Sequence, residues 1–428
     1  MDLRRFRILC FIKYLEYYFN TKVIDLLVKN NVVYGVKTSN NTTIEFNDGV
    51  VNNIYGGGFE GNVEKESNIV FNNGEVKNDI FGGGYLGAVN DSNISISNGI
   101  INGNVYGGGY SNDVNNNVIL NVNGSTINKN IYGGGYAGDV IGDTFINFYK
   151  GTVLNNIYGG GFIGTVNNTS VVVLEESSKY GDIKIYGSIF GGGYGLTATV
   201  YETTNVSVNL NLNQTVEEKL ITTSRISEAT SGESAVEVSF VDGYSFIDGS
   251  IYGGGDLGQI GIGIINTSNN TATVSKCGRT NVLLLNGYIG GSVFGGGSGI
   301  PKEDTYQLEM GTIYGSTKVT ISGGYINKNV YGGGTQSRVY FSNLNDSSIT
   351  LATDVSIEEN EKPIVINGSV FGGGDRGNSA TTNASVHTTI GNVKVSINGN
   401  SLGSQIYFVT GGVYGDGNLC LVKGETLT

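Results

Sequence analysis

The sequence predicts an all-β fold, a right-handed parallel β-helix (solenoid) of about eleven coils with a short N-terminal helix. Three observations lead to this prediction. A glycine-rich motif recurs along most of the chain, apolar residues alternate between the copies, and glycine is abundant while proline is rare. The 428 residues include 70 Gly, 26 Tyr and 17 Phe but only 2 Pro, a composition typical of a folded chain that is prone to form strands.

The repeated motif is an Ile or Val, then a Tyr or Phe, then three glycines. It occurs ten times, and Val413-Tyr414-Gly415-Asp416-Gly417 is a degenerate eleventh copy. The triplets begin at Gly56, Gly82, Gly107, Gly133, Gly159, Gly191, Gly253, Gly295, Gly332 and Gly372. The first five are spaced 26, 25, 26 and 26 residues apart, so residues 36–195 are predicted to form regular coils of about 26 residues.

Each unit between two motifs contains further strand signals. In the first unit, Ile69 and Phe71 alternate with polar residues, which is the period of a strand. Asn73-Gly74 then indicates a turn, and Val76 begins a short stretch that leads to the next motif. We therefore expect three or four short strands per unit, each stacked on its counterpart about 4.8 Å away in the next coil.

The motif itself constrains the cross-section of the coil. Neighbouring residues of a strand point to opposite faces, so we expect Ile and Val to point inward and the aromatic rings to stack on an outer face or at a corner. The triplet Gly56-Gly57-Gly58 and its counterparts permit either a corner with positive φ or an approach of backbones too close for a Cβ atom. The residue before each motif is polar, from Asn53 to Ser369. Stacked polar side chains of this kind are predicted to form a hydrogen-bonded ladder along the axis.

The two ends of the chain depart from the regular array. Residues 1–35 are interpreted as a helical cap or as the remnant of a leader, because an Arg-rich start is followed by an apolar run too short for a signal peptide. Residues 196–428 are predicted to continue the solenoid with inserted loops, since the motif spacings lengthen to 32, 62, 42, 37 and 40. The expected inserts are 196–243, which is the longest, 257–285, 300–318 and 336–365. No polar cap is evident near Thr428, so we also expect end-to-end self-association or continuation into a partner.

Charge and cysteine content exclude several classes of protein. Only 14% of the residues are charged and the net charge is −12, so we expect no nucleic-acid partner. The three cysteines, Cys10, Cys277 and Cys420, lie far apart and predict neither a disulfide framework nor a zinc site. No apolar run reaches the 18 or so residues of a membrane-spanning helix.

Several local patterns suggest sites, but each has a simpler interpretation. Gly56-x-Gly58-x-x-Gly61 matches a dinucleotide fingerprint, but β-prone residues follow where a helix is required, and the pattern occurs six times. Asp256 and Asp375 follow glycine triplets and are candidate ligands of an isolated calcium ion, with a solvated turn as the alternative. His387 is the single histidine and has no acidic neighbour in sequence. We therefore expect no catalytic residues and no cofactor apart from such a calcium ion.

The Val-Tyr-Gly-Gly-Gly copies, together with Thr320-Ile321-Ser322-Gly323-Gly324, resemble the Gly-rich repeat arrays of large bacterial surface proteins. The resemblance is to adhesin-like or autotransporter-passenger β-helices and covers residues 50–428. It implies a parallel β-helix at the cell surface or outside the cell. It carries over no functional residues, because such arrays share no common site.

Three functions remain as hypotheses. The first is a non-enzymatic, adhesin-like scaffold that binds a host or matrix glycan or protein through its insert loops or through a stacked aromatic and Asn face. The second is a polysaccharide-acting β-helix enzyme, a lyase or glycosidase, which would need clustered carboxylates and a nearby basic residue such as the Asp375-Arg376 pair. The third is a self-assembling structural protein of the envelope.

Overall fold

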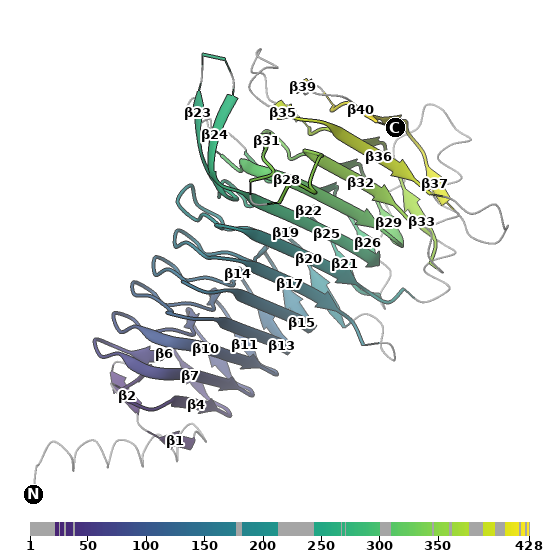
Figure 1. Ribbon diagram of the computed structural model, residues 1–428. Coiled ribbons are helices and arrows are strands. Elements are labelled where there is room, and N and C mark those ends of the chain that lie inside the picture. The colour runs from purple at the N-terminus through teal and green to yellow at the C-terminus, as the bar shows by residue number, and fades with distance from the viewer. Residues whose placement is uncertain are drawn as a thin grey trace, which may run out of the picture.

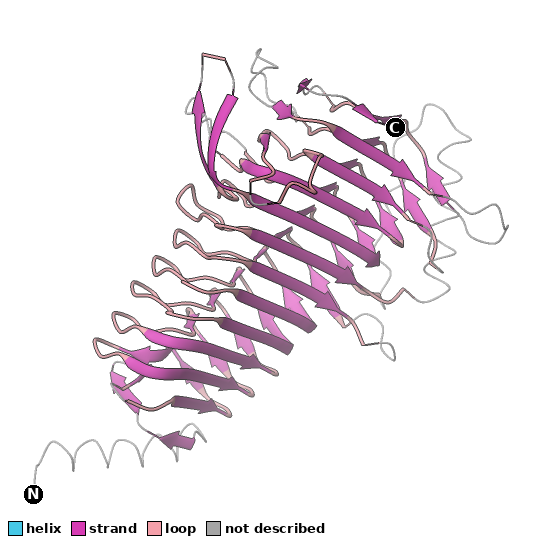
Figure 2. Cartoon of the chain, in the orientation of Figure 1, coloured by secondary structure: helices cyan, strands magenta, loops and turns pink. Residues whose placement is uncertain are grey.

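The computed structural model shows an all-β protein whose parallel strands stack into long sheets, as in a parallel β-helix (Figure 1). No helix occurs among the residues that the structure describes (Figure 2). These are residues 22–427 except 25, 30, 37–38, 177–181, 213–243, 267, 270, 300–309, 345, 359–361, 376–387, 399–406, 419–420 and 424–425.

Three walls surround the core, and each consists of one strand per coil. Wall 1 holds the long strands, which face the viewer in Figure 1: β4 (Thr42–Phe46), β7 (Val63–Phe71), β10 (Val89–Ile96), β13 (Val118–Ile127), β15 (Thr144–Val153), β17 (Thr169–Leu174), β20 (Thr203–Asn209), β25 (Gly278–Asn286), β28 (Ile313–Ile321), β32 (Thr353–Ile357), β36 (Val393–Ile397) and β40 (Thr426–Leu427). Wall 2 holds short strands: β5 (Val50–Val51), β8 (Glu75–Val76), β11 (Ile100–Ile101), β18 (Ile183–Ile185), β21 (Phe246–Ile247), β26 (Tyr288–Ile289), β29 (Gly324–Ile326), β33 (Ile364–Ile366) and β37 (Tyr407–Val409). Strands β13 and β15 run through both walls and join them into one sheet.

Wall 3 carries the repeated motif: β3 (Val32–Gly35), β6 (Asn53–Gly58), β9 (Ile80–Phe81), β12 (Val105–Tyr106), β14 (Ile131–Tyr132), β16 (Ile157–Tyr158), β19 (Ile189–Phe190), β22 (Ile251–Tyr252), β27 (Val293–Phe294), β30 (Val330–Tyr331), β34 (Val370–Phe371) and β38 (Val413–Tyr414). The remaining strands are β1 (Lys22–Ile24), β2 (Leu26–Lys29), β23 (Ile262–Asn266), β24 (Thr271–Lys276), β31 (Val339–Phe341), β35 (Thr388–Ile390) and β39 (Leu421–Lys423).

The inward residues of wall 1 form one continuous apolar column. The parallel register places like above like through eleven strands, confirming the stacking that the repeat predicts: Ile44, Ile69, Ile94, Leu120, Ile146, Val171, Val206, Val282, Val319, Val355 and Val395. The Ile and Val of the ten full motif copies complete the same core from wall 3 and are fully buried, for example Ile131, whereas Val413 of the eleventh copy is exposed. No single coil could bury this apolar surface alone, so the stacking itself stabilises the fold.

The motif aromatics point away from this core, but they are buried or half-buried in every coil except the last, where Tyr414 is exposed. Their rings stack face to face along wall 3 with centroids 4.6 to 5.0 Å apart, from Tyr34 to Tyr414. In the regular coils a second aromatic column covers them edge-on: Phe59, Tyr85, Tyr110, Tyr136, Phe162 and Tyr194. Tyr158 is consequently only 1% exposed. The expected outer aromatic face is therefore covered in these six coils, because the residue after each of the first six triplets supplies a ring, whereas Asp256, Ser298, Thr335 and Asp375 follow the later triplets.

The glycine triplets allow coils to approach closely and do not form left-handed corners. A Cβ atom on Gly57 would lie 2.6 Å from the backbone nitrogen of Gly84, and central glycines of later triplets meet the third glycine of the next coil in the same way. Positive φ occurs instead at the turn glycines between walls 1 and 2, such as Gly74 (φ 106°) and Gly99 (φ 89°). The triplets could either bend the chain or let coils approach closely, and the structure shows close approach. Their backbone groups accordingly form regular hydrogen bonds from coil to coil.

The predicted polar ladder is present beside the motif. Each side-chain oxygen accepts a hydrogen bond from the backbone N–H one coil further on, as from Asp79 to Asn53 Oδ1 (3.0 Å) and from Asn156 to Asn130 Oδ1 (3.0 Å). The ladder continues through serines to Ser369, whose hydroxyl accepts from Gly412 N (3.1 Å). It satisfies backbone donors at the corner between walls 2 and 3, where the strands are interrupted.

A second ladder was not foreseen and lies inside the coil. In most wall 1 strands a buried Thr or Ser donates to the carbonyl oxygen of the first triplet glycine in the next coil, for example Thr144 to Gly159 (2.6 Å) and Thr280 to Gly295 (2.5 Å). The signal in the sequence is a hydroxyl residue two positions before each inward apolar pair, such as Ser67 before Ile69. Val118 interrupts this ladder in an otherwise regular coil.

Val118→Thr is expected to stabilise the protein. The new hydroxyl would occupy the place of a nearly isosteric methyl group and donate to the Gly133 carbonyl, adding about 1 kcal/mol to the free energy of unfolding. Urea denaturation measures the change. The matched control is Val122→Thr in the same strand, where the hydroxyl would enter the apolar core without a partner and cost about 1–3 kcal/mol. Equal losses in both variants would contradict the proposed bond.

The N-terminal part differs from the predicted helical cap. Within residues 1–35, β1 pairs antiparallel with β4, β2 pairs antiparallel with β3, and β3 pairs parallel with β6. Val33-Tyr34-Gly35 is an unrecognised partial copy of the motif, since Val33 stacks on Ile54 and Tyr34 stacks on Tyr55. Residues 22–35 are therefore mostly strand, while residues 1–21 lie outside the described residues.

Parts of all four expected inserts are wall strands. Strand β20 lies within 196–243, β25 overlaps 257–285, β28 overlaps 300–318, and β32 lies within 336–365. These strands keep the Thr-x-Val alternation of wall 1, which the longer motif spacings obscured. The segments between strands are thus shorter than expected, and 213–243 and 300–309 lie outside the described residues.

Candidate functional site

The hairpin β23–β24 is the most prominent departure from regular coiling, and it rises from the body at the top of Figure 1. Its outer face exposes Ile264 (76%) and Ile262 (38%), with Thr273 paired opposite Ile264. Its inner face packs on Tyr314, because a Cβ atom on Gly263 would lie 2.4 Å from that ring. The hairpin is therefore an exposed arm with a fixed base.

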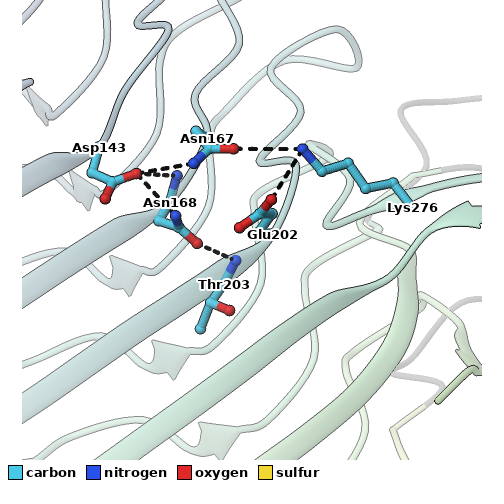
Figure 3. Close-up of polar contacts among 6 residues, drawn as sticks. All are labelled: Asp143, Asn167, Asn168, Glu202, Thr203 and Lys276. Carbon is cyan, nitrogen blue, oxygen red and sulfur yellow. Dashed lines mark hydrogen bonds and ion pairs between the residues drawn. The ribbon is translucent and has the colours of Figure 1, made fainter. Parts of the chain in front are cut away.

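A polar ladder on wall 1 leads to the base of this hairpin (Figure 3). Asp143 Oδ1 accepts hydrogen bonds from Asn167 Nδ2 (3.2 Å) and Asn168 Nδ2 (2.9 Å). Asn168 Oδ1 in turn accepts from the backbone N–H of Thr203 (2.8 Å). Three successive coils are thereby aligned at the N-terminal ends of their long strands.

Lys276, the last residue of β24, meets the end of this ladder. Its Nζ lies 3.3 Å from Glu202 Oε1 and donates to Asn167 Oδ1 (3.5 Å), as Figure 3 shows. The ammonium group also lies 5.0 Å from the centre of the Tyr201 ring. The ion pair is half-exposed, so each contact contributes little alone, but together they orient the hairpin relative to wall 1.

Arg279 lies three residues beyond Lys276 and holds a neighbouring loop. Its Nη1 is 3.1 Å from Asp346 Oδ2. Hydrogen bonds from the hydroxyl and backbone N–H of Ser348, together with Arg279, lower the pKa of Asp346 below the ordinary carboxyl value. Cys277 lies between Lys276 and Arg279 in the sequence. Burial raises the pKa of its thiol, which donates to the carbonyl of Ser342 (3.1 Å). Ser342 and Asp346 are thus held by Cys277 and by Arg279 of β25, respectively.

Two hollows border Arg279 on the outer face of wall 1. The hairpin hollow has a volume of about 210 Å³ and is lined by Glu202, Thr203, Lys276, Cys277, Arg279 and Leu344. The loop hollow has a volume of about 200 Å³, and its lining includes Arg279, Asn281, Lys318, Asp354 and the loop 348–351. Their linings combine opposite charges with hydroxyl groups, which suits polar ligands.

No family model, no curated protein and no solved structure matches this chain. The site is therefore interpreted from its own residues. Within the described part of the chain, no helix is long and apolar enough to cross a membrane.

The calcium candidates Asp256 and Asp375 are not brought together. They occupy one bridge column, separated by Ser298 and Thr335, so three coil steps of about 4.8 Å place them roughly 14 Å apart. Asp256 Oδ2 accepts from the Tyr158 hydroxyl (3.3 Å), and Asp375 Oδ1 accepts from Asn418 Nδ2 (3.1 Å). Among the residues described, no group of three or more His, Cys, Asp or Glu side chains is arranged to hold a metal ion.

Other residues singled out in the sequence lie outside the described residues. These are His387, Arg376, Cys10 and Cys420. Conversely, sequence reasoning missed Lys276, Arg279, Glu202 and Asp346 as a group. The available signal was the pair of basic residues on either side of Cys277 in a chain with few charges.

Proposed function

We propose that this chain is a non-enzymatic, adhesin-like binding scaffold that is exposed on a cell surface or secreted. It is a right-handed solenoid of about eleven coils, and it binds a host or matrix glycan or protein through the segments inserted between its walls. A surface rich in Asn, Ser and Thr and poor in charge is common on exported β proteins and supports this location.

The hairpin β23–β24 is the observation that carries the proposal. Coil stacking does not require it, since Gly261 and Gly278 on either side of it are in backbone contact and the coil closes beneath it. It nevertheless presents two adjacent isoleucines to solvent on a base fixed by Tyr314 and Lys276. Exposed apolar side chains on a pre-organised arm are typical of a contact surface, because little conformational entropy is lost on binding.

Ile264→Asp is expected to weaken binding at least tenfold in an assay against immobilised mucin, collagen, fibronectin, laminin and a glycan array. A carboxylate at the centre of an apolar contact would have to be desolvated without a partner. The matched control is Ile141→Asp, at a residue that is 59% exposed on a regular coil, and it should bind as the wild type does.

Two results would overturn the proposal. New reducing ends released from a polysaccharide would select the enzyme hypothesis. Absence of binding together with filaments that form with rising protein concentration in electron micrographs would select self-assembly.

A further inference from the structure

The hairpin hollow and the loop hollow lie next to each other, because the side chain of Arg279 lines both. We infer that together they form a groove with two subsites for a neutral saccharide chain. The inference rests on the proposed function and specifies the class of ligand at one of its surfaces.

The floor of the groove is rigid. Thr203 of β20 pairs with Arg279 of β25, Asn281 pairs with Lys318 of β28, and Lys318 pairs with Asp354 of β32. The groove thus crosses four successive wall 1 strands and runs along the solenoid axis for about 14 Å, at about 4.8 Å per strand. Side chains on a continuous sheet keep their positions better than side chains on loops.

The sides of the groove come from the two segments attached to this floor. Lys276 and Cys277 at the base of the hairpin border the hairpin hollow together with Leu344, and residues 348–351 border the loop hollow. Contacts from Lys276 to Glu202 and from Arg279 to Asp346 hold both sides in place. Each hollow has a volume equal to roughly seven molecules of liquid water, which is the scale of a single sugar ring.

The charges of the groove favour a neutral ligand. The cations Lys276, Arg279 and Lys318 are balanced by Glu202 and Asp354 in the lining and by Asp346 behind Arg279. The whole chain carries a net charge of −12, so its surroundings do not attract anions. A polyhydroxylated ligand suits this arrangement, because each hydroxyl group can accept from a cation and donate to a carboxylate.

Two polar atoms beside the loop hollow have no hydrogen-bond partner, namely Arg279 Nε and Asp354 Oδ1. One is a donor and the other an acceptor, and both are buried, so leaving them unpaired is costly. A small rotation of either side chain toward the hollow would let a sugar hydroxyl accept from Nε and another donate to Oδ1. Ile349 and Leu351, which line the loop hollow, would then contact the apolar face of the ring, and Leu344 would do so for a ring in the hairpin hollow.

Isothermal titration of the full chain with cellobiose, maltose, chitobiose, mannobiose and lactose tests the inference, with digalacturonate and sialyllactose as acidic comparators. We expect at least one neutral disaccharide to bind, and to bind more tightly than either acidic sugar. Asp354→Asn and Arg279→Lys should each weaken this binding about tenfold or more, since each keeps the volume of the side chain but changes its hydrogen-bonding groups. Lys394→Ala is the matched control, since Lys394 is the partner of Asp354 on the next strand but lies outside both hollows, and it should change affinity less than twofold.

Failure of this inference differs from failure of the proposed function. If no neutral sugar binds, if only acidic sugars bind, or if Asp354→Asn and Arg279→Lys both bind as the wild type does, the saccharide groove is wrong. The scaffold proposal would still stand if Ile264→Asp weakened binding to a matrix protein. If the bound disaccharide were hydrolysed, the saccharide site would stand and the non-enzymatic function would fall.

Discussion

Gly57→Val is expected to separate the first coils of the solenoid. A Cβ atom at this position would lie 2.6 Å from Gly84 N, 2.7 Å from Val89 Cγ1 and 2.8 Å from Gly84 Cα, and two of these atoms are backbone that cannot rotate away. The backbone of Gly57 also donates to the carbonyl of Gly83 (3.1 Å), so displacing the coil breaks coil-to-coil hydrogen bonds as well. We expect a loss of at least about 3 kcal/mol, at or beyond the upper end of the usual cost of overpacking.

Hydrogen exchange measures this effect where it should occur. In a solenoid each coil contacts only its neighbours, so the amides of β6 and β9 should lose protection while those of β25 and β28 keep theirs. Glu64→Val is the matched control, because it places the same side chain on an exposed position of the adjoining strand β7 and should change stability by less than about 0.5 kcal/mol. Unchanged protection of β6 in Gly57→Val would contradict the close approach of the coils.

Alkaline unfolding should be unusually steep for this protein. Burial raises the pKa values of Tyr55, Tyr106, Tyr132 and Tyr158 in the stacked column far above their ordinary value of 10.0. In the unfolded chain these hydroxyls ionise near pH 10, whereas in the folded chain they keep their protons. The unfolded state therefore binds fewer protons above pH 10, so the contribution of these tyrosines to stability is constant below that pH and falls as the pH rises further.

Each such tyrosine contributes about 1.4 kcal/mol per pH unit, so these four together give a slope of about 5 kcal/mol per pH unit above pH 10. Urea midpoints at pH 8, 10, 10.5 and 11 measure this slope, and absorbance of tyrosinate shows whether ionisation coincides with unfolding.

Tyr132→Phe provides the control for this titration. Phe81 and Phe190 already occupy equivalent places in the column, so the ring stack should survive the substitution. Stability at pH 8 should remain nearly the same, while the alkaline slope should decrease by about 1.4 kcal/mol per pH unit. A slope that does not change, or tyrosinate absorbance that appears before unfolding, would show that these hydroxyls are accessible to solvent in the folded state.

The local sequence pattern was sufficient to predict the repeating part of the fold. The recurrence of Ile-Tyr-Gly-Gly-Gly at 26-residue spacing predicts stacked coils, because equal lengths bring identical residues into register. The i, i+2 alternation at Ile69 and Phe71 identifies the inward face of wall 1, and the polar residue before each motif predicts the ladder from Asn53 to Ser369. These features are properties of one coil and its nearest neighbour, so they can be read from a single repeat.

The tertiary structure decided the features that a single repeat does not specify, namely the role of the glycine triplets and the position of the hairpin and the groove. Whether the triplets bend the chain or let coils approach follows from the distance between Gly57 and Gly84, which no sequence pattern specifies. Glu202 meets Lys276, and Asp346 meets Arg279, only after β20 and β25 have stacked and the segments between strands have folded over one wall. A repeat determines its own scaffold because its contacts are local. The hairpin and the groove depend on where irregular segments leave that scaffold, and this is set by packing between coils.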